Sequence, residues 1–328
     1  MASGQERILR RRIRSINSTK KITRAMELIA GSRIVRAQAR VQAAAPYADQ
    51  ITQVVRDLAA AGGTASNSPY LVPRPEIRNV AYVVIAADRG LCGGYNSSVI
   101  RAAEGVMREH AALGRGYELH VVGRKVEGYF RYRDYRIAAA HTGFSDQPSY
   151  EDARTVAAGV ERSFVAGDVD LVILVYTRFV SSGSQEVVVR PLIPLDPETF
   201  EQTEETEGVS PDYEFEPGPG EILEELLPRY AEARVYAALL NAAASEHAAR
   251  QRAMKSATDN AEDLITSLTR VMNRARQDAI TTEIMEVVGG AEALRSGDDM
   301  HTTSSEHVYG TDFPSTSPDS FAESRSSS

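Results

Sequence analysis

The stretch Glu221–Val288 reads EILEELLPRYAEARVYAALLNAAASEHAARQRAMKSATDNAEDLITSLTRVMNRARQDAITTEIMEVV. It contains no glycine and a single proline, Pro228, and it is rich in alanine, leucine, glutamate and arginine, which favour helices. One helix of this length would measure about 100 Å at ~1.5 Å per residue. A compact body of 328 residues has a radius of gyration of only about 20 Å. The helix must therefore extend beyond a compact core, and its apolar side needs a partner.

A second long helix is predicted at the start of the chain, because residues 7–61 contain no glycine or proline apart from Gly31 and Pro46. Alternating steps of three and four residues define a seam along it, and most seam positions are apolar. The seam is Leu9, Ile13, Ile16, Lys20, Thr23, Glu27, Ala30, Ile34, Ala37, Val41, Ala44, Ala48, Ile51, Val55 and Leu58. This spacing is typical of a coiled coil. Pro46 should kink or restart the helix.

The three polar seam positions, Lys20, Thr23 and Glu27, are consecutive, and beside them the apolar row moves by one residue. The shifted row is Ile22, Met26 and Ile29. We expect the shift to change the side of the helix that meets its partner. The C-terminal stretch offers a matching seam, which is Ala261, Ile265, Leu268, Met272, Ala275 and Ala279.

Between the two helices the periodicity changes. Short apolar runs rich in β-branched residues predict strands at Val80–Ala87, Tyr117–Val122, Leu171–Tyr176 and Glu186–Arg190. Helical stretches alternate with them at Ser97–Leu113, Arg124–Phe130 and Tyr150–Ala166. This alternation predicts a small, mostly parallel, Rossmann-like α/β domain. The predicted order is a helix (1–61), a linker (62–77), the α/β domain (78–195), an acidic linker (196–220), a second helix (221–294) and a disordered tail (295–328).

The charge of the chain is unevenly distributed. Residues 1–40 hold 11 Lys and Arg against 2 Asp and Glu, a net of +9, whereas residues 196–225 hold 12 acidic residues and no basic ones, a net of −12. A basic helix can bind nucleic acid, but here the basic residues are not interleaved with aromatic ones. A solvated helix face is the simplest interpretation, an acidic protein partner comes next, and nucleic acid is not expected.

Cysteine content and hydropathy indicate the compartment. The single cysteine, Cys92, rules out an intramolecular disulfide and fits a reducing environment. The sequence has no apolar run of membrane-spanning length and no secretory signal pattern, so we expect its basic start to be part of the mature protein.

The loop Asp88–Asn96 (DRGLCGGYN) follows the first predicted strand and leads into a helix, which is where a Rossmann-type domain holds a phosphate. It matches neither G-x-G-x-x-G nor the P-loop pattern. No histidine is placed by sequence as a base for Cys92, and the six histidines lack metal-ligand spacing. We therefore predict no catalytic set, no cofactor and no metal site.

Several long motifs resemble one family. They are IRSI at 13–16, TKKITRAMEL at 19–28, DRGLCGGYN at 88–96, AMKSATDNA at 253–261 and RARQDAIT at 274–281 with Glu283-Ile284 close behind. Together, and in family order over residues 5–294, they resemble the γ subunits (central stalk) of bacterial F-type ATP synthases. The cysteine pair of redox-regulated plastid members is missing.

The resemblance implies an antiparallel coiled coil of the terminal helices, inserted as an axle into a ring of three α and three β subunits. It also implies that the α/β domain binds the ε subunit and sits on the c-ring, at the cytoplasmic side of the cell membrane. Proton flow would turn the c-ring and the axle, and the asymmetric axle would drive the β catalytic sites through their states in turn. The chain itself would be non-catalytic.

The resemblance also assigns roles to individual residues. Positions that match family contacts with β are Met26, Arg250, Arg276, Gln277 and Thr281. The loop with Asp88, Arg89 and Cys92 matches a surface facing β. Tyr213 and Phe215 match the foot that touches the c-ring and ε.

Two other functions fit part of the pattern. A static coiled-coil scaffold would have the long helices but would not need the motifs around Met26 and Arg276–Thr281. A nucleotide-dependent enzyme built on the α/β domain would bind nucleotide as an isolated chain. The tail departs from the family, which usually ends near Gly289–Leu294; here 34 further residues follow, with 2 basic and 6 acidic side chains.

Overall fold

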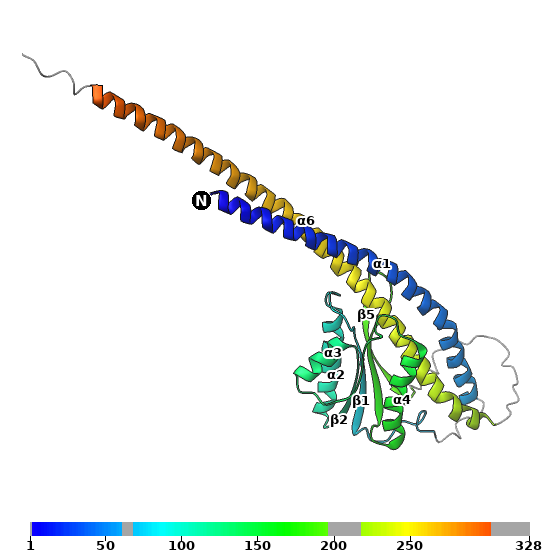
Figure 1. The fold of residues 1–328 in the computed structure, drawn as a ribbon. Helices are drawn as coiled ribbons and strands as arrows, with labels where there is room; N and C mark the ends of the chain where they lie inside the picture. Colours follow the sequence, from blue (N-terminus) through cyan, green and yellow to red (C-terminus); the bar gives the residue numbers. More distant parts are fainter. Residues whose placement is uncertain (1, 61–67, 196–217, 303–328) are drawn as a thin grey trace, which may run out of the picture. The chain divides into compact units, whose positions relative to one another are not determined.

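The computed structural model describes residues 2–60, 68–195 and 218–302 (Figure 1). It divides into two units, one formed by Met1–Arg14 with Thr266–Ser328 and the other by Ser15–Ile265. Helix α1 (Ala2–Ala60) and helix α6 (Pro219–Thr302) each contribute to both units. Within the described ranges, no helix combines the length and the hydropathy that a membrane-spanning segment requires.

The Ser15–Ile265 unit contains a five-stranded sheet in the order β3-β2-β1-β4-β5. The strands are β1 (Asn79–Ile85), β2 (Gly116–Val122), β3 (Ile137–His141), β4 (Leu171–Phe179) and β5 (Gln185–Ile193). The first four are parallel and β5 pairs antiparallel with β4. The prediction of a mostly parallel, Rossmann-like domain is therefore confirmed. Strand β3 was not predicted, because its short, alanine-rich sequence (IAAAH) lacks the run of β-branched residues that marks the others.

Helices cover both faces of the sheet (Figure 1). On one face, α2 (Tyr95–Ala112) and α3 (Arg124–Tyr132) pack against alternate residues of β1, such as Val80 and Tyr82. On the other face, α4 (Tyr150–Ala166) packs together with the end of α1 and the start of α6. The residues that join this second core from α1 and α6 include Ile51, Val55, Leu58, Leu223, Leu227 and Leu239. The long helices are therefore part of the hydrophobic core of the α/β domain.

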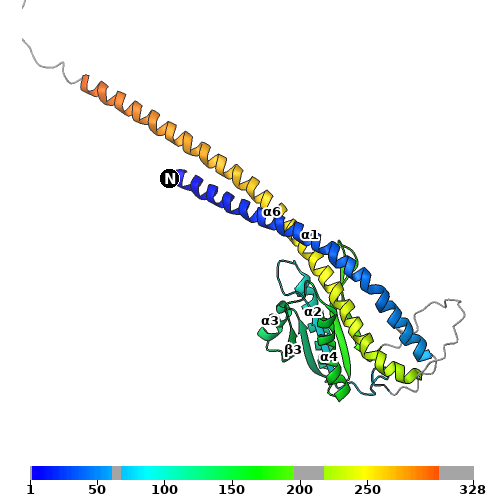
Figure 2. The ribbon, with the colours of Figure 1, turned by 45° about the vertical axis from the view of Figure 1, so that its right-hand side comes forward.

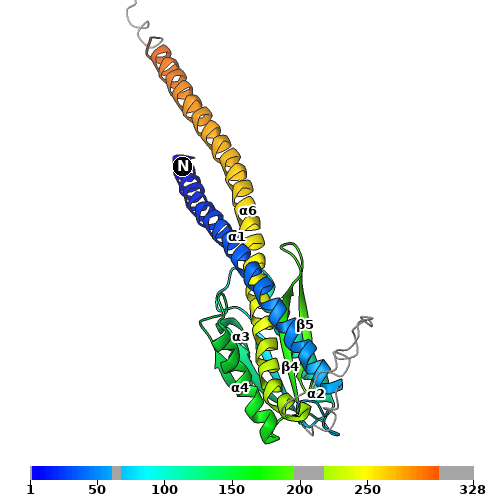
Figure 3. The same ribbon diagram turned by 90° about the vertical axis from the view of Figure 1, so that its right-hand side faces the viewer.

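Beyond this core, α1 and α6 lie side by side within the same unit, as the views in Figures 2 and 3 also show. Lys20 Nζ is 3.1 Å from Glu262 Oε1, and Thr23 Oγ1 is 2.8 Å from Thr258 Oγ1. Because the partner number falls as the α1 number rises, the helices are antiparallel, as predicted.

The predicted seams agree with the observed burial. Every α1 seam position from Leu9 to Leu58 is buried or half-buried, including the polar ones. On α6, Ala261 is buried, and the other five predicted seam positions, Ile265 to Ala279, are half-buried. The Met1–Arg14 and Thr266–Ser328 unit contains the ends of both seams, and from Thr281 to Arg295 every α6 residue is exposed.

The predicted shift of the seam is wrong. Ile22 and Ile29 are 60% and 55% exposed, whereas Thr23 and Glu27 are each only 9% exposed. The polar side chains stay inside because they find partners there: Thr23 bonds to Thr258, and Glu27 accepts from Arg24 Nη1 at 2.9 Å. The helix therefore keeps one seam, and the displaced apolar side chains remain on its surface.

The structure bears on two expectations about helix limits. Of the two effects expected of Pro46, a kink or a restart, the restart does not occur, because α1 continues through Pro46. Pro46 is exposed, so water can satisfy the carbonyl that loses its amide partner. Helix α6 continues past Leu294 to Thr302, because the polar residues that follow Leu294 include no proline before the helix ends. The predicted tail therefore begins with helix, and residues 303–328 lie outside the described part of the chain.

Candidate functional site

The loop between β1 and α2 lies at the carboxyl edge of the sheet, next to the point where the chain order reverses between β1 and β4. Open α/β sheets usually bind ligands in the crevice at this point. Here helix α6 forms one wall: Ser245 Oγ donates to Thr177 O at 3.1 Å, and Tyr95 Oη donates to Ala242 O at 3.2 Å. A cavity of about 460 Å³ remains between the loop, β4, β5 and α6. The loop, which was expected to face β, is held against α6 by the Tyr95 hydrogen bond.

Asp88 organises the loops at this edge. Its carboxylate accepts hydrogen bonds from the backbone amides of Arg124, Gly143 and Ser145 at 3.1, 2.9 and 3.1 Å. It thereby ties the loop after β1 to the loops after β2 and β3. Asp88 was predicted to face β; in the structure its carboxylate is engaged within the chain.

The tip of the loop is formed by Arg89 and Leu91. Arg89 is exposed, and Leu91 is 61% exposed. Leu91 has φ of 62°, in the left-handed region that non-glycine residues rarely adopt. An apolar side chain held outward by a strained backbone is typical of a contact surface. Cys92 does not belong to that surface, because it is only 1% exposed.

The Cys92 thiol is a packing group. Its Sγ accepts from Asn96 Nδ2 at 3.2 Å, and burial raises the pKa of the thiol above its ordinary value. A buried thiol with a raised pKa is a poor nucleophile. Of the three predicted loop residues, the structure therefore leaves Arg89 available to a partner.

Arg250 is buried. It is 8% exposed, and its Nη2 lies 2.6 Å from Glu246 Oε1, while Glu246 is 1% exposed. The guanidinium also donates to the carbonyl oxygens of Gly90 and Arg89 at 3.4 and 3.5 Å. Arg250 was predicted to take part in the contact with β, which stays a prediction; within the chain its guanidinium holds the loop after β1.

Glu246 and Ser145 complete this network, and the sequence analysis missed both. Ser145 Oγ donates to Glu246 Oε2 at 3.2 Å and accepts from the Asp88 amide at 2.9 Å. Burial raises the pKa of the Glu246 carboxyl, and Arg250 and Ser145 oppose that shift. The sequence did carry a signal: the pair Glu246 and Arg250 stands among alanines in AAASEHAAR, which is an unusual setting for a solvated salt bridge.

Met26 and the residues of the C-terminal segment differ in exposure. Met26 is half-buried on α1, between the exposed Ile22 and Ile29. Arg276, Gln277 and Thr281 are exposed on α6, and Thr281 Oγ1 donates to Gln277 O at 3.0 Å within the helix. Met26 and Arg250 belong to one unit, and Arg276, Gln277 and Thr281 belong to the other. Tyr213 and Phe215 lie outside the described residues.

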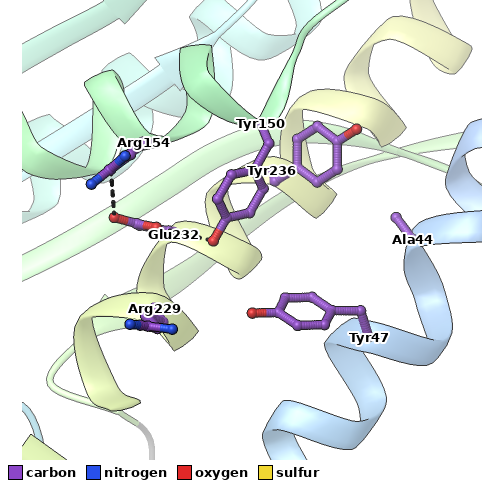
Figure 4. A pocket seen from close by; sticks show the side chains of 7 residues that line it. All are labelled: Ala44, Tyr47, Tyr150, Arg154, Arg229, Glu232 and Tyr236. Atoms are coloured by element: carbon purple, nitrogen blue, oxygen red, sulfur yellow. Dashed lines mark hydrogen bonds and ion pairs between the residues drawn. The ribbon is translucent and has the colours of Figure 1, made fainter. Parts of the chain in front are cut away.

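A separate cavity of about 630 Å³ opens between α1, α4 and α6. Figure 4 shows Tyr47, Tyr150 and Tyr236 around it, with Glu232 on the α6 side. The Glu232 carboxylate already accepts from Tyr150 Oη at 3.0 Å and lies 3.6 Å from Arg154 Nε. This cavity therefore offers a ligand little free polar capacity. In the parts of the chain that the structure describes, no group of three or more His, Cys, Asp or Glu residues could hold a metal ion.

Comparison with known proteins identifies the family. The family model described as ATP synthase matches residues 5–294. The ATP synthase gamma chain of Frankia casuarinae is 53% identical over 301 residues, covering 90% of this chain and 99% of the relative. That of Mycolicibacterium smegmatis is 48% identical over 302 residues, covering 88% and 97%.

Solved structures support the fold. A chain of the Euglena gracilis mitochondrial ATP synthase in an OSCP/F1/c-ring structure aligns with a TM-score of 0.64 at 17% identity, covering 95% of this chain and 99% of that one. A second Euglena gracilis structure, of the rotor, gives a TM-score of 0.60 at 16% identity, covering 85% and 99%. The family match and the bacterial relatives are sufficient for assignment. This chain belongs to the ATP synthase gamma-chain family, the non-catalytic rotor subunits that form the central stalk of F1Fo ATP synthase.

Proposed function

We propose that this chain couples rotation of a c-ring to conformational change at the catalytic β subunits. In this proposal the paired helices α1 and α6 turn inside a ring of three α and three β subunits, and the α/β domain joins the c-ring and ε. The chain would be peripheral to the cell membrane, at its cytoplasmic side.

The observation that carries the proposal is the apolar surface that the paired helices leave uncovered. On α1, Ile22, Leu28, Ile29 and Val35 are between 55% and 66% exposed. On α6, Ile284, Met285, Val287 and Val288 are between 56% and 68% exposed. A helix surrounded only by water normally carries polar residues away from its packed face, so large apolar side chains exposed on several sides of a helix indicate association with another protein. A shaft enclosed by other subunits would cover such side chains on all sides.

The charge of α1 fits the same partner. The eleven basic residues among positions 1–40 lie on the helix that would turn inside the ring. Exposed ion pairs contribute only about 0–1 kcal/mol each. Attraction to acidic segments of β would therefore favour contact without locking the shaft in one orientation, which a rotating element requires.

The proposed coupling contacts follow from exposure. Arg276, Gln277 and Thr281 would contact β directly from α6, and Met26 would do so from α1. Arg89 would contact β from the loop after β1. In linkage terms, these contacts can drive β only if they differ between β conformations. Solved structures of the same fold, from a rotor and from a central stalk with a c-ring, support the same arrangement.

Co-purification tests the proposal. A tagged chain isolated from its native membrane should bring down α, β and ε in the ratio 3:3:1 with the chain, together with c subunits. Recovery of the chain alone, or with unrelated proteins, would favour a static coiled-coil scaffold. Calorimetry of the isolated chain with ATP tests the enzyme alternative, since micromolar binding would support a nucleotide site in the α/β domain.

A further inference from the structure

The buried ion pair between Glu246 and Arg250 links α6 to the loop after β1 by two routes. Through Ser145, the Glu246 carboxylate reaches the Asp88 amide. Through Arg250, it reaches the carbonyl oxygens of Arg89 and Gly90. Both routes end on the three residues that precede the exposed Leu91. Both links to the loop therefore begin at one carboxylate on α6, that of Glu246.

An ion pair is a poor way to stabilise this position. Two charges taken out of water lose much of their hydration, and apolar side chains of similar volume often stabilise a core as well or better. Hydrogen bonds to chosen carbonyl and amide groups, however, fix the orientation of a backbone in a way that apolar packing cannot. The buried pair at Glu246 is therefore better suited to orienting the loop after β1 than to stabilising the fold.

We propose that Glu246 is a positioning residue, which holds the loop Asp88–Asn96 in a fixed orientation on α6 so that Arg89 and Leu91 move with the helix. This inference rests on the proposed coupling function. It places Arg250 behind the contact surface: Arg250 acts on the partner through the loop that it supports. Arg89 and Leu91 present a cation and an apolar side chain, which fit an acidic partner segment with an apolar neighbour.

The substitution Ser145→Ala separates orientation from folding. It removes one buried hydroxyl, which cuts the link between Glu246 and the Asp88 amide, and it leaves the Glu246–Arg250 pair intact. Ser163→Ala is the matched control, because Ser163 Oγ also donates to a carboxylate, Glu118 Oε1 at 2.8 Å, but that carboxylate belongs to β2 and not to α6. Glu246→Gln is a second variant, which keeps the shape of the side chain and removes its charge.

Two measurements apply to the full chain and to the complex that contains it. Hydrogen exchange of peptides covering residues 86–96 in the full chain reports how firmly the loop is held. Protons pumped per ATP hydrolysed in membrane vesicles report coupling. We expect Ser145→Ala and Glu246→Gln to speed exchange in the loop by about tenfold relative to Ser163→Ala, and to lower the number of protons pumped per ATP.

A merely structural role for Glu246 would lower the midpoint of thermal unfolding in Ser145→Ala and Glu246→Gln and leave the pumping ratio unchanged. If Ser145→Ala exchanges and pumps like Ser163→Ala, the inference is wrong. Faster loop exchange with an unchanged pumping ratio would also overturn it. If Glu246→Gln does not fold, the loop exchange and the pumping ratio of Ser145→Ala test the inference alone. If the unmodified chain does not associate with α and β, the proposed function fails, while the exchange data still report whether the loop is held.

Discussion

At the scale of single residues, position and partner matter more than residue type. Asp88, Arg250 and Cys92 are residue types that often carry chemistry, yet each is engaged within the chain, by backbone amides, a buried carboxylate and an asparagine respectively. Leu91, an apolar residue, is the one held outward at the loop tip. The loop residues available to a partner are therefore those whose side chains are not hydrogen-bonded or buried within the chain.

Gly123 gives the first prediction at this scale. Its φ is 101°, and a Cβ atom placed on it would lie 2.3 Å from Ala86 O and 2.8 Å from Ala86 C. Both neighbours are backbone atoms at the end of β1 and cannot rotate away. Gly123→Ala should lower the free energy of unfolding by about 3 kcal/mol or more, measured by chemical denaturation of the full chain.

Gly128 supplies the control for that measurement. It lies inside α3, and a Cβ atom placed on it would meet nothing within 4 Å. Gly128→Ala should leave stability unchanged or raise it by up to about 1 kcal/mol. Equal losses for the two variants would contradict the assignment of a backbone clash at Gly123.

Glu161 gives a pH-dependent prediction. Burial, and to a lesser extent the nearby Glu232, raises the pKa of its carboxyl from 4.5 to about 7. Because the folded chain then binds a proton that the unfolded chain has already released, the free energy of unfolding falls as the pH rises from 4.5 to about 7. Glu161→Gln should remove this loss. The variant should be more stable than the parent by about 1–2 kcal/mol near pH ~8 and equal to it near pH ~4, after allowance for partial solvent screening.

Thermal unfolding of both chains across this pH range tests the claim. Glu151→Gln is the control, since Glu151 lies on the same helix with its side chain 75% exposed. A stability difference that does not change with pH would show that folding leaves the pKa of Glu161 at its ordinary value.

At the scale of elements, the sequence predicted the features that follow from hydrophobic periodicity. It missed the features that depend on contacts between residues far apart in the chain. The heptad spacing correctly placed the α1 seam and the α6 seam, because apolar side chains at that spacing have only one way to be buried together. Hydropathy alone moved the α1 seam at Ile22, since it could not show that Thr23 would meet Thr258 235 residues away. Glu246 was missed for the same reason. A glutamate on a helix is expected to be exposed to solvent, and its burial is explained only by Ser145 and Arg250, which the fold brings beside it.

The polar layer of the seam can be tested by a double-mutant cycle on Thr23 and Thr258. The two hydroxyls lie 2.8 Å apart, and Thr258 Oγ1 is also 2.9 Å from Met254 O. Thr23→Val should cost about 1 kcal/mol, because it leaves Thr258 buried with fewer partners. The double variant Thr23→Val with Thr258→Val should cost less than the sum of the single ones by about 0.5–1 kcal/mol. Strict additivity, measured by denaturation, would mean that the two hydroxyls do not interact.

At the scale of the whole molecule, a small α/β domain and two terminal helices share the hydrophobic core on one face of the sheet. The domain alone has the strand order of a ligand-binding fold, but α6 forms one wall of its crevice, and α1 and α6 cover one face of its sheet. Fold class was therefore predictable from the alternation of strands and helices. The position of α6 at the crevice could not be predicted, because α6 follows the strands much later in the sequence.

Removal of residues 295–328 is the prediction at this scale. The segment carries 6 acidic and 2 basic side chains and little apolar content, so it can contribute little buried apolar surface to an assembly. A chain that ends at Leu294 should assemble normally and support near-normal ATPase activity in the complex. The measurement is ATP hydrolysis by purified complexes with and without the segment. A several-fold rise in hydrolysis on truncation would instead identify the segment as a brake on rotation.

The polar layer also constrains anyone who would re-engineer the length of the helix pair. Lys20 meets Glu262, and Thr23 meets Thr258. Inserting seven residues into α6 between the α/β domain and Lys255, and none into α1, would move α6 outward by one heptad, so that Lys255 would oppose Lys20 in place of Glu262. A shorter or longer version would therefore have to lose or gain whole heptads from both helices at matched positions, so that each polar pair keeps its partner.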